Sequence, residues 1–521
     1  MGTITLDLTR ASSYWLALLP EIVLCAWAML VLIVDVAHKG NRSEPSRPSI
    51  TWLALAGVVA TAVANAFLLR VRAVPGPAMV MLDEFRIFIN FVILVSAALT
   101  LLMADGYLDR RGINRGEFQA LVLFATVGMM LMAGARDLLM VFIALELMSI
   151  SVYVLAGFDR MDERSVEGAL KYFLLGAFSS AFFLFGIALS WGATGTTDIG
   201  VMGRTVLGGA ENVTPLLLAG MAMLMVGFGF KVAAMPFHMW TPDAYDGAPT
   251  PITSLMSTGV KAAAFASFIR VFVIGFGGAI ERWQIAGFLI AGVTMVGANL
   301  IAMTEGSLKR MLAYSSIAHA GYLLVALMAA SPAGAAAFLF YLLVYTLMTA
   351  GAFAVLIANS REATGQERVS LEDWRGFARE KPLLAALFSV FLLSLAGFPL
   401  TAGFLGKLYI LRAAVSAGPT ELTELAVLLV LSSLVSYFYY LRVIVVMYMT
   451  PARDEGEHRA ARLPSPAMAG VVIAALLVVG LFFAGRWPMG WAERSAGTLW
   501  QDVGAGTTGA AQPAGPVARV P

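Results

Sequence analysis

Long apolar runs recur along the whole of this 521-residue chain, and they limit its fold more than any other feature. Each run is about 18 to 25 residues long, which suits a helix that crosses the hydrocarbon core of a bilayer. The runs do not alternate between apolar and polar residues, which excludes the strands of a membrane barrel. Only 13% of the residues are charged, about half the share of a soluble domain. The sequence therefore predicts an all-α polytopic membrane protein.

Fourteen runs are long enough to be transmembrane spans. We expect them near residues 15–36, 51–70, 86–104, 117–134, 138–158, 168–190, 214–240, 251–276, 284–303, 310–330, 334–359, 383–412, 423–449 and 466–486. The first run lacks a cleavable signal pattern, so we expect it to be retained as a span. The tail 488–521 ends in a Gly/Ala/Pro-rich stretch and is expected to be disordered.

Lysine and arginine are distributed unequally between the predicted loops. The odd-numbered loops, such as those joining spans one to two and three to four, hold 18 of these residues, and the even-numbered loops hold 6. Because basic loops stay in the cytoplasm, we expect the odd-numbered loops to be cytoplasmic. With fourteen spans, both termini then lie on the non-cytoplasmic side.

The sequence lacks the signatures of several other chemistries. The net charge is +2 and there is no basic block, so no nucleic-acid partner is expected. Cys25 is the only cysteine, which excludes a disulfide within the chain and any multi-cysteine metal or iron–sulfur site. There is no Walker motif and no GxGxxG after a strand. We therefore expect neither a metal nor a cofactor in this chain.

Charged residues inside the apolar runs are informative, because each costs about 2.5–3.5 kcal/mol at mid-bilayer. Glu146 is the ninth of the 21 residues between Asp137 and Asp159, and none of the others is charged. A carboxyl group at this depth is either part of a functional site or a protonated group that joins helices.

The seventh run contains the stretch "VGFGFKVAAMPFHMW", residues 226–240. Pro236 removes an amide donor and should break the helix just after Lys231. A broken membrane helix is tolerated where it is buried in protein or lines a wet cavity. His238 would share a face with Lys231 if the helix were continuous. The alternative is that Lys231 snorkels from a short helix to the interface.

Two other runs carry a lysine far from their ends. Lys261 lies in "TPITSLMSTGVKAAAFASFIRV", where small residues permit close helix packing. Lys407 follows Pro399 and Gly403, where we expect a second break, because the segment is too long for one straight span. Lys407 is only five residues before Arg412, so snorkelling is the alternative there.

Lys171 and His319 each fit two interpretations. Lys171 follows Glu167 by four residues, so it could form an i,i+4 pair, snorkel to the interface or join a proton relay. His319 could be a hydrogen-bonded core residue or a relay member. Hydroxyl groups that could carry protons between the lysines are those of Tyr314, Ser315, Ser316 and Tyr345.

The two expected breaks suggest a repeat. They fall in spans seven and twelve, and an offset of five spans gives equivalent units opposite orientations, as in secondary transporters. The predicted units are spans 4–8 (117–276) and spans 9–13 (277–450), with spans 1–3 before them (1–116) and span 14 after them (451–487). Burial disfavours a charged amine and a nearby carboxylate favours it. A Glu–Lys pair that forms and parts would therefore make the lysine bind and release a proton.

Five segments resemble the antiporter-like membrane subunits of respiratory complex I. They are "LMVFIALELMSISVYVLAGF", "EGALKYFLLGAFSSAFFLFG", "FKVAAMPFHMWTPDAYDGAPTP", "LKRMLAYSSIAHAGYLL" and "LAGFPLTAGFLGKLYIL". The likeness extends from about residue 80 to 450. The N-type members are the most similar, because "KYFLLGAFSS" is typical of them. In addition, M-type members typically have a glutamate in place of Lys407. L-type members have a long lateral helix, which we do not expect after span fourteen here.

The resemblance implies that the chain translocates protons in the membrane arm of NADH–quinone oxidoreductase. It implies a relay made of Glu146, Lys171, Lys231, His238, Lys261, His319 and Lys407. It also implies that FMN, iron–sulfur clusters and quinone belong to partner subunits, with subunits M, K, J and A as neighbours in a bacterial inner membrane. Two alternatives are a Mrp-type cation/proton antiporter subunit and a non-conducting membrane scaffold.

Overall fold

The computed structural model describes residues 4–7, 11–38, 48–74, 79–113, 115–360, 367–451 and 465–500. Within these ranges, 13 helical segments are long and apolar enough to cross a membrane. Twelve are single helices: α2 (Leu19–His38), α3 (Pro48–Phe67), α4 (Glu84–Ala104), α6 (Gly116–Gly134), α7 (Leu138–Ala156), α8 (Glu163–Thr194), α10 (Pro215–Val232), α14 (Ile280–Thr304), α15 (Leu308–Met328), α16 (Pro332–Ala358), α20 (Thr420–Met449) and α21 (Ser465–Ala484).

The eighth and twelfth predicted spans are each made of more than one helical segment. The eighth is continuous through α12 (Thr250–Leu255), π-helical residues Met256–Val260, α13 (Lys261–Ile269) and π-helical residues Arg270–Gly275. The twelfth is divided into α18 (Pro382–Ala396) and α19 (Ala402–Ser416). With this divided span, all fourteen predicted spans correspond to helices of the structure. The all-α prediction is therefore confirmed.

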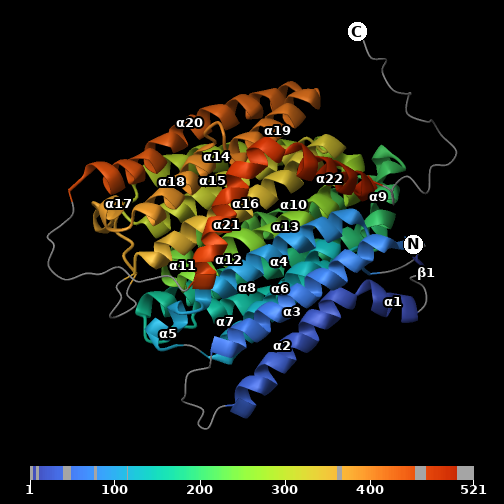
Figure 1. Ribbon diagram of the computed structural model, residues 1–521. Helices are drawn as coiled ribbons and strands as arrows, with labels where there is room; N and C mark the ends of the chain where they lie inside the picture. The colour runs from blue at the N-terminus through green and yellow to red at the C-terminus, as the bar shows by residue number, and fades with distance from the viewer. Residues whose placement is uncertain are drawn as a thin grey trace.

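Short elements lie at the two ends of the bundle. The short helices are α1 (Ala11–Ala17), α5 (Tyr107–Arg111), α9 (Ile199–Leu207), α11 (Thr241–Gly247), α17 (Phe377–Glu380) and α22 (Arg486–Gly497), with 3-10 turns at Leu68–Arg70, Ala210–Asn212, Gly277–Ala279, Leu371–Trp374 and Thr498–Trp500. Strands β1 (Ile4–Asp7) and β2 (Val71–Val74) pair in parallel. In Figure 1, α5, α11 and α17 lie at the end formed by the odd-numbered loops, and α1, α9 and α22 lie at the opposite end. We call these the odd-loop end and the even-loop end.

The centre of the bundle is formed by the eighth, tenth and eleventh spans. In the most apolar window of each, all or 94% of the residues are buried, whereas about a third are buried in α2, α8 and α20. The peripheral helices therefore expose apolar side chains, as lipid contact requires. The eighth span carries Lys261 and α15 carries His319, so both residues lie on central helices.

A short backbone bridge at each end of the bundle follows the same pattern. Asp137, which caps α7, pairs with Asp198 after α8 at the even-loop end. Ser307, which caps α15, pairs with Ser370 after α16 at the odd-loop end. The same arrangement on opposite faces is what two inverted units produce. The boundaries of the units, 117–276 and 277–450, remain a prediction.

The expectation of a disordered tail is wrong for residues 488–500. These residues belong to α22 and to the 3-10 turn Thr498–Trp500. The Trp491 ring packs on Phe88 of α4 with 4.6 Å between centroids, and Ala492 and Ala496 are fully buried. Packing of one apolar face stabilises this helix, a contact that the tail's composition did not reveal. Residues 501–521 lie outside the described residues.

Candidate functional site

Lys231 lies in the last turn of α10, directly before a break in the helix. The chain leaves the helix at Ala233, whose φ of 61° is left-handed, and Met235–Pro236 is a cis peptide. Because α10 ends at Val232 and the next helix, α11, begins at Thr241, the predicted break is confirmed. The buried Lys231 Nζ donates to Ser149 Oγ at 2.7 Å and to the Tyr153 hydroxyl at 3.3 Å, and both acceptors belong to α7.

Aromatic rings surround the same ammonium group. Lys231 Nζ lies 5.4 Å from the ring centre of Tyr153, 5.9 Å from that of Tyr172 and 5.7 Å from that of Phe230. Cations are attracted to ring faces at such distances. Lys231 is thus held by protein groups and does not snorkel to the interface.

Glu146 lies one turn from Ser149 on α7 and interacts electrostatically with Lys231. Its Oε1 accepts a hydrogen bond from Ser180 Oγ of α8 at 2.5 Å. Among the ion pairs of the described residues, none joins Glu146 directly to Lys231. The acid and the base are therefore neighbours without a direct ion pair, and Ser149 and Tyr153 bind Lys231 from the helix that carries Glu146.

Lys261 lies where the first π-helical segment of the eighth span gives way to α13. Its buried Nζ donates to the Ser316 carbonyl at 2.5 Å and to Ser316 Oγ at 2.6 Å. π-Helical turns often occur at functional sites. This contact joins the eighth span directly to α15.

His319 lies one turn beyond Ser316 on α15 and is fully enclosed by protein. Its Nδ1 is 2.6 Å from the Tyr341 hydroxyl of α16, and its Nε2 is 3.4 Å from the Tyr440 hydroxyl of α20. The same Tyr440 hydroxyl bonds Ser315 Oγ. His319 therefore belongs to a hydrogen-bonded cluster that spans three helices.

Lys407 lies beside the second break. α18 ends at Ala396, and Gly397 follows with a left-handed φ of 89°. Lys407 Nζ donates to the carbonyl oxygens of Leu395 and Ala396 at 3.0 and 2.9 Å. It also lies 4.7 Å from the ring centre of Tyr322, which contacts the His319 ring. Lys407 thus caps a helix end inside the bundle, and the predicted break is confirmed.

Lys171 and His238 lie apart from the other candidate residues, which we call the row: Glu146, Lys231, Lys261, His319 and Lys407. Lys171 pairs with Glu167 at 2.6 Å and Asp243 at 2.8 Å, and its side chain is 44% exposed. The i,i+4 pair that the sequence left open is therefore present. His238 lies in the break after α10 and is half-buried. Within the described residues, no hydrogen bond joins its ring to a lysine of the row.

Several residues near the row were not foreseen. Ser149 and Tyr153 follow Glu146 by three and seven residues, so helical spacing would have indicated them. Tyr245 of α11 is buried and lies against Ser316, near Lys261. Tyr322 and Tyr440 could not be singled out, because buried tyrosines are common in apolar helices. Tyr314, by contrast, is only partly buried.

Three further ion pairs are buried at the ends of the bundle. They join Arg86 to Glu21 at 2.6 Å, Arg270 to Asp83 at 2.7 Å and Lys309 to Glu367 at 2.9 Å. Nothing in the sequence marks Lys309 as buried, because it lies directly before a predicted span. Within the described residues, no three His, Cys, Asp or Glu side chains are grouped so that they could hold a metal ion.

Comparison with known proteins gives one consistent family. The family model described as NADH:quinone oxidoreductase/Mrp antiporter, TM, matches residues 135–435. NADH-quinone oxidoreductase subunit N of Trichlorobacter lovleyi is 43% identical over 89% of this chain and 93% of that protein. Subunit N 1 of Sorangium cellulosum is 44% identical over 91% of this chain and 96% of that protein.

Solved structures give the same result for the fold. A chain of respiratory complex I from Thermus thermophilus with bound aureothin is 36% identical, with a TM-score of 0.75, and the match covers 90% of this chain and 98% of that one. A chain of the Mrp complex from Dietzia sp. has a TM-score of 0.77 but is 22% identical, with 94% and 98% covered. The second likeness is one of fold alone.

Proposed function

Because the chain belongs to the N subunits of NADH-quinone oxidoreductase, within the NADH:quinone oxidoreductase/Mrp antiporter family, we propose that it carries protons across the membrane. It is a multi-pass subunit of the membrane arm of complex I. Quinone reduction in other subunits would drive the transfer. The observation that carries the proposal is the buried contact of Lys261 with Ser316, one turn from the His319 cluster.

The first part of the relay is the Glu146–Lys231 site. Lys231 is bound by hydroxyl groups, which accept a hydrogen bond from an ammonium and can also donate one to a neutral amine. A movement that brings Glu146 against Lys231 would favour the charged amine, and their separation would favour release of the proton. The Ser149 hydroxyl, one turn from Glu146 on α7, already accepts from Lys231.

The second part leads from Lys261 to Lys407. Lys261 contacts Ser316, Ser315 shares the Tyr440 hydroxyl with His319, and Lys407 stands over Tyr322 beside His319. Tyr245 lies against Ser316 and provides a step back toward the Lys231 site. Within the described residues, the buried hydroxyl groups of Tyr172 and Ser254 have no hydrogen-bond partner. Water commonly bonds such groups in proteins, and it would complete the path.

The free energy of moving a proton against the membrane potential sets a lower limit on how much the proton affinity of the relay groups must change. Moving one charge against 100 mV costs about 2.3 kcal/mol. One unit of pKa corresponds to about 1.36 kcal/mol. The affinity of the relay groups for protons must therefore change by more than one pKa unit for each charge moved at that potential.

The orientation and the partners of the chain complete the proposal. The excess of basic residues in the odd-numbered loops supports a cytoplasmic odd-loop end, with both termini on the opposite side of a bacterial inner membrane. Protons would then pass from the odd-loop end to the even-loop end. FMN, iron–sulfur clusters and quinone would reside in other subunits. Subunits M, K, J and A would be the neighbours of this chain.

Replacement of Lys261 by Ala in the assembled complex tests the relay. We expect proton pumping to fall at least about tenfold, which corresponds to a rise of about 1.4 kcal/mol in the rate-limiting barrier. NADH oxidation should fall with it, because the two are coupled. Pumping is measured by dye quenching in membrane vesicles. Normal pumping by a fully assembled variant would contradict the relay and favour a non-conducting scaffold.

Sodium transport separates the proposal from the antiporter alternative. A Mrp-type subunit would exchange Na⁺ for H⁺ without NADH. We expect vesicles that carry the complex to acidify only when NADH is oxidised, and to show no sodium-dependent proton movement in its absence. The opposite result would favour the antiporter.

A further inference from the structure

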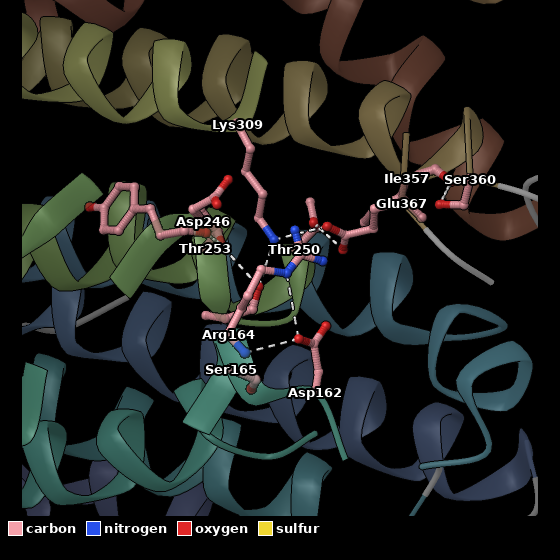
Figure 2. Close-up of polar contacts among 12 residues, drawn as sticks. Asp162, Arg164, Ser165, Asp246, Thr250, Thr253, Lys309, Ile357, Ser360 and Glu367 are labelled. Atoms are coloured by element: carbon pink, nitrogen blue, oxygen red, sulfur yellow. Dashed lines mark hydrogen bonds and ion pairs between the residues drawn. The ribbon is translucent and has the colours of Figure 1, made fainter. Parts of the chain in front are cut away.

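Glu367 is a buried carboxylate at the odd-loop end, outside the row of lysines. Its Oε1 accepts hydrogen bonds from the Tyr107 hydroxyl at 2.7 Å and the Thr250 hydroxyl at 2.5 Å, and its Oε2 accepts one from Lys309 Nζ at 2.9 Å. Figure 2 shows Lys309 reaching from α15 toward Glu367 and Thr250. Three separate elements, α5, α12 and α15, thus meet at a single carboxylate.

The Glu367–Lys309 pair is almost completely removed from water. The Lys309 and Glu367 side chains are 1% and 6% exposed, and Lys309 also donates to the Ala248 carbonyl at 2.7 Å. Burial alone would raise the pKa of Glu367, but the Lys309 ammonium and the hydrogen bonds from Thr250 and Tyr107 outweigh it and hold the pKa at about 2. The carboxylate is therefore charged at every physiological pH.

The positions of this pair are uncharged in the other predicted unit. Leu308 N donates to the Val369 carbonyl, as Leu138 N donates to the Thr197 carbonyl at the opposite end of the bundle. When these bridges are superposed by position, Lys309 corresponds to Leu139 and Glu367 corresponds to Gly195. The bridge of the first unit carries an ion pair of its own, between Arg136 and Asp198, but those side chains are 11% and 20% exposed. The second unit thus adds a more deeply buried pair at different positions.

The pair also reaches from the second unit into the first. Thr250 begins the continuous span that carries Lys261 eleven residues later, about 16 Å along a helix. Lys309 precedes Ser316 on α15 by seven residues, about 10 Å. The two helices are therefore joined twice: once through Glu367 at the odd-loop end, and once where Lys261 meets Ser316.

We propose that Glu367 is a positioning residue that fixes the eighth span against α15, and thereby holds Lys261 Nζ within hydrogen-bond reach of Ser316. This inference rests on the proposed function. In the step that Glu367 serves, an N–H bond of the Lys261 ammonium breaks and an O–H bond forms at Ser316 Oγ. Ser316 passes its own proton to the next acceptor, and Lys261 becomes neutral. Glu367 takes no part in the bond changes, because it contacts none of these atoms.

Two variants of the full complex test the proposal. Glu367→Gln removes the charge and keeps an oxygen that can accept from Thr250 and Tyr107. Because this leaves the Lys309 ammonium buried without a counter-ion, the variant could fail to assemble. The double variant Glu367→Gln/Lys309→Met removes both charges and avoids that defect. Asp198→Asn is the matched control, since it removes the Arg136–Asp198 ion pair at the equivalent bridge and keeps the side-chain oxygen that caps α9.

The measurements are proton pumping and NADH oxidation per assembled complex, in H₂O and in D₂O. We expect both Glu367 variants to pump at least about threefold more slowly per complex. We also expect a larger solvent isotope effect, because a misaligned Lys261–Ser316 contact makes proton transfer rate-limiting. Asp198→Asn should match the wild type in both respects. A residue with only a structural role would lower the amount of complex and leave turnover and the isotope effect unchanged.

A parallel measurement on Lys261→Ala separates this inference from the proposed function. If Lys261→Ala pumps like the wild type, the relay itself is wrong and Glu367 has nothing to position. If Lys261→Ala is impaired while the double variant has wild-type turnover and isotope effect, the positioning role of Glu367 alone is overturned.

Discussion

The two broken spans each bind a lysine, but with different chemistry. Lys231 precedes its break and donates to the hydroxyl groups of Ser149 and Tyr153 on another helix. Lys407 follows its break and donates to the carbonyl oxygens of Leu395 and Ala396, at the open end of the preceding half-helix. Carbonyl oxygens can only accept, whereas hydroxyl groups accept and donate.

This difference suggests that the two lysine sites have different roles. The last carbonyls of a helix carry a partial negative charge and suit a cation. The partners at the Lys407 site can only accept from an amine, whereas those at the Lys231 site can also donate to one. In the proposed relay, the Lys231 site, with Glu146 as a neighbour, is therefore the better switch. Each prediction below either contradicts this comparison or makes it more specific.

The largest effect is expected for Lys407→Met. The Leu395 and Ala396 carbonyls would lose a buried donor, and each unsatisfied group costs about 1–3 kcal/mol. We expect lower thermal stability of the complex and pumping reduced more than about tenfold, since 1.4 kcal/mol is already tenfold. Lys407→Arg, which keeps donors and charge, should lose less of both. Wild-type thermal stability of Lys407→Met would show that the carbonyl contacts do not matter.

Lys231→Met should lower pumping by about five- to tenfold, which corresponds to roughly 1–1.4 kcal/mol. Its effect on stability should be smaller than that of Lys407→Met, because the Ser149 and Tyr153 hydroxyl groups can rotate to other partners. Pumping assays and thermal inactivation of the same membranes measure the two effects. The comparison is reversed if Lys231→Met is the less stable of the two variants.

Gly397 and Ala233 follow the helices that end at the two breaks, and substitutions there should change the stability of the complex in opposite directions. Gly397 has a φ of 89°, and a Cβ there would lie 3.0 Å from Lys407 Cδ. Gly397→Ala should therefore destabilise the complex by about 1–2 kcal/mol. Ala233 has a φ of 61° without being glycine, so Ala233→Gly should be neutral or stabilising by up to about 1 kcal/mol. Thermal inactivation shows whether each variant is stabilised or destabilised. A change in the same direction for both variants would contradict the prediction.

Ser149→Ala should lower pumping about threefold, because it removes the shorter of the two hydroxyl contacts, worth roughly 0.6 kcal/mol, at the low end for a hydrogen bond. Tyr153→Phe removes the contact of 3.3 Å and should have a smaller effect. Ser151→Ala is a suitable control, since the hydrogen bond of Ser151 in the described part of the chain goes to the Leu147 carbonyl of its own helix. If Ser151→Ala were as slow as Ser149→Ala, the effect would belong to α7 in general.

The sequence predicted the spans and both breaks for simple reasons. Apolar runs have the length that a bilayer requires. A proline in the interior of a helix interrupts it, and Pro236 and Pro399 fall inside predicted spans. Lysines in apolar runs are conspicuous, so Lys231, Lys261 and Lys407 were found directly. Lys171 fitted two interpretations, because a lysine four positions after a glutamate can form an ion pair with it whether or not the lysine also takes part in proton transfer.

The partners of these residues could not be predicted. Tyr440 meets Ser315 from 125 residues away, and the apolar pattern of α20 gives no sign of it. Glu367 and Lys309 lie near span ends, where charges are common, so the sequence does not mark them as buried. Their burial depends on how α5, α12 and α15 pack together, which is a tertiary property. The helix at 488–500 was missed for the same reason.

The smallest effect is expected at Asp243, which holds α11 after the first break. Its carboxylate accepts from Lys171 at 2.8 Å and from Arg310 at 2.9 Å. Burial alone would raise the pKa of Asp243, but hydrogen bonds from these two cations lower it below 3.8. A lowered carboxyl pKa gives stability that is present above the ordinary value and is lost as the pH falls through the lowered one.

Asp243→Asn should therefore cost the same small amount at pH 5 and at pH 8, about 0.5 kcal/mol, because the pair is partly exposed. The cost should shrink at high salt, as for other screened pairs. Thermal inactivation at the two pH values and at low and high salt checks this. α11 is only seven residues long, whereas α19 has fifteen. If Asp243→Asn slowed pumping more than Ser149→Ala, movement of α11, and not exchange at the hydroxyl groups, would be what distinguishes the first break from the second.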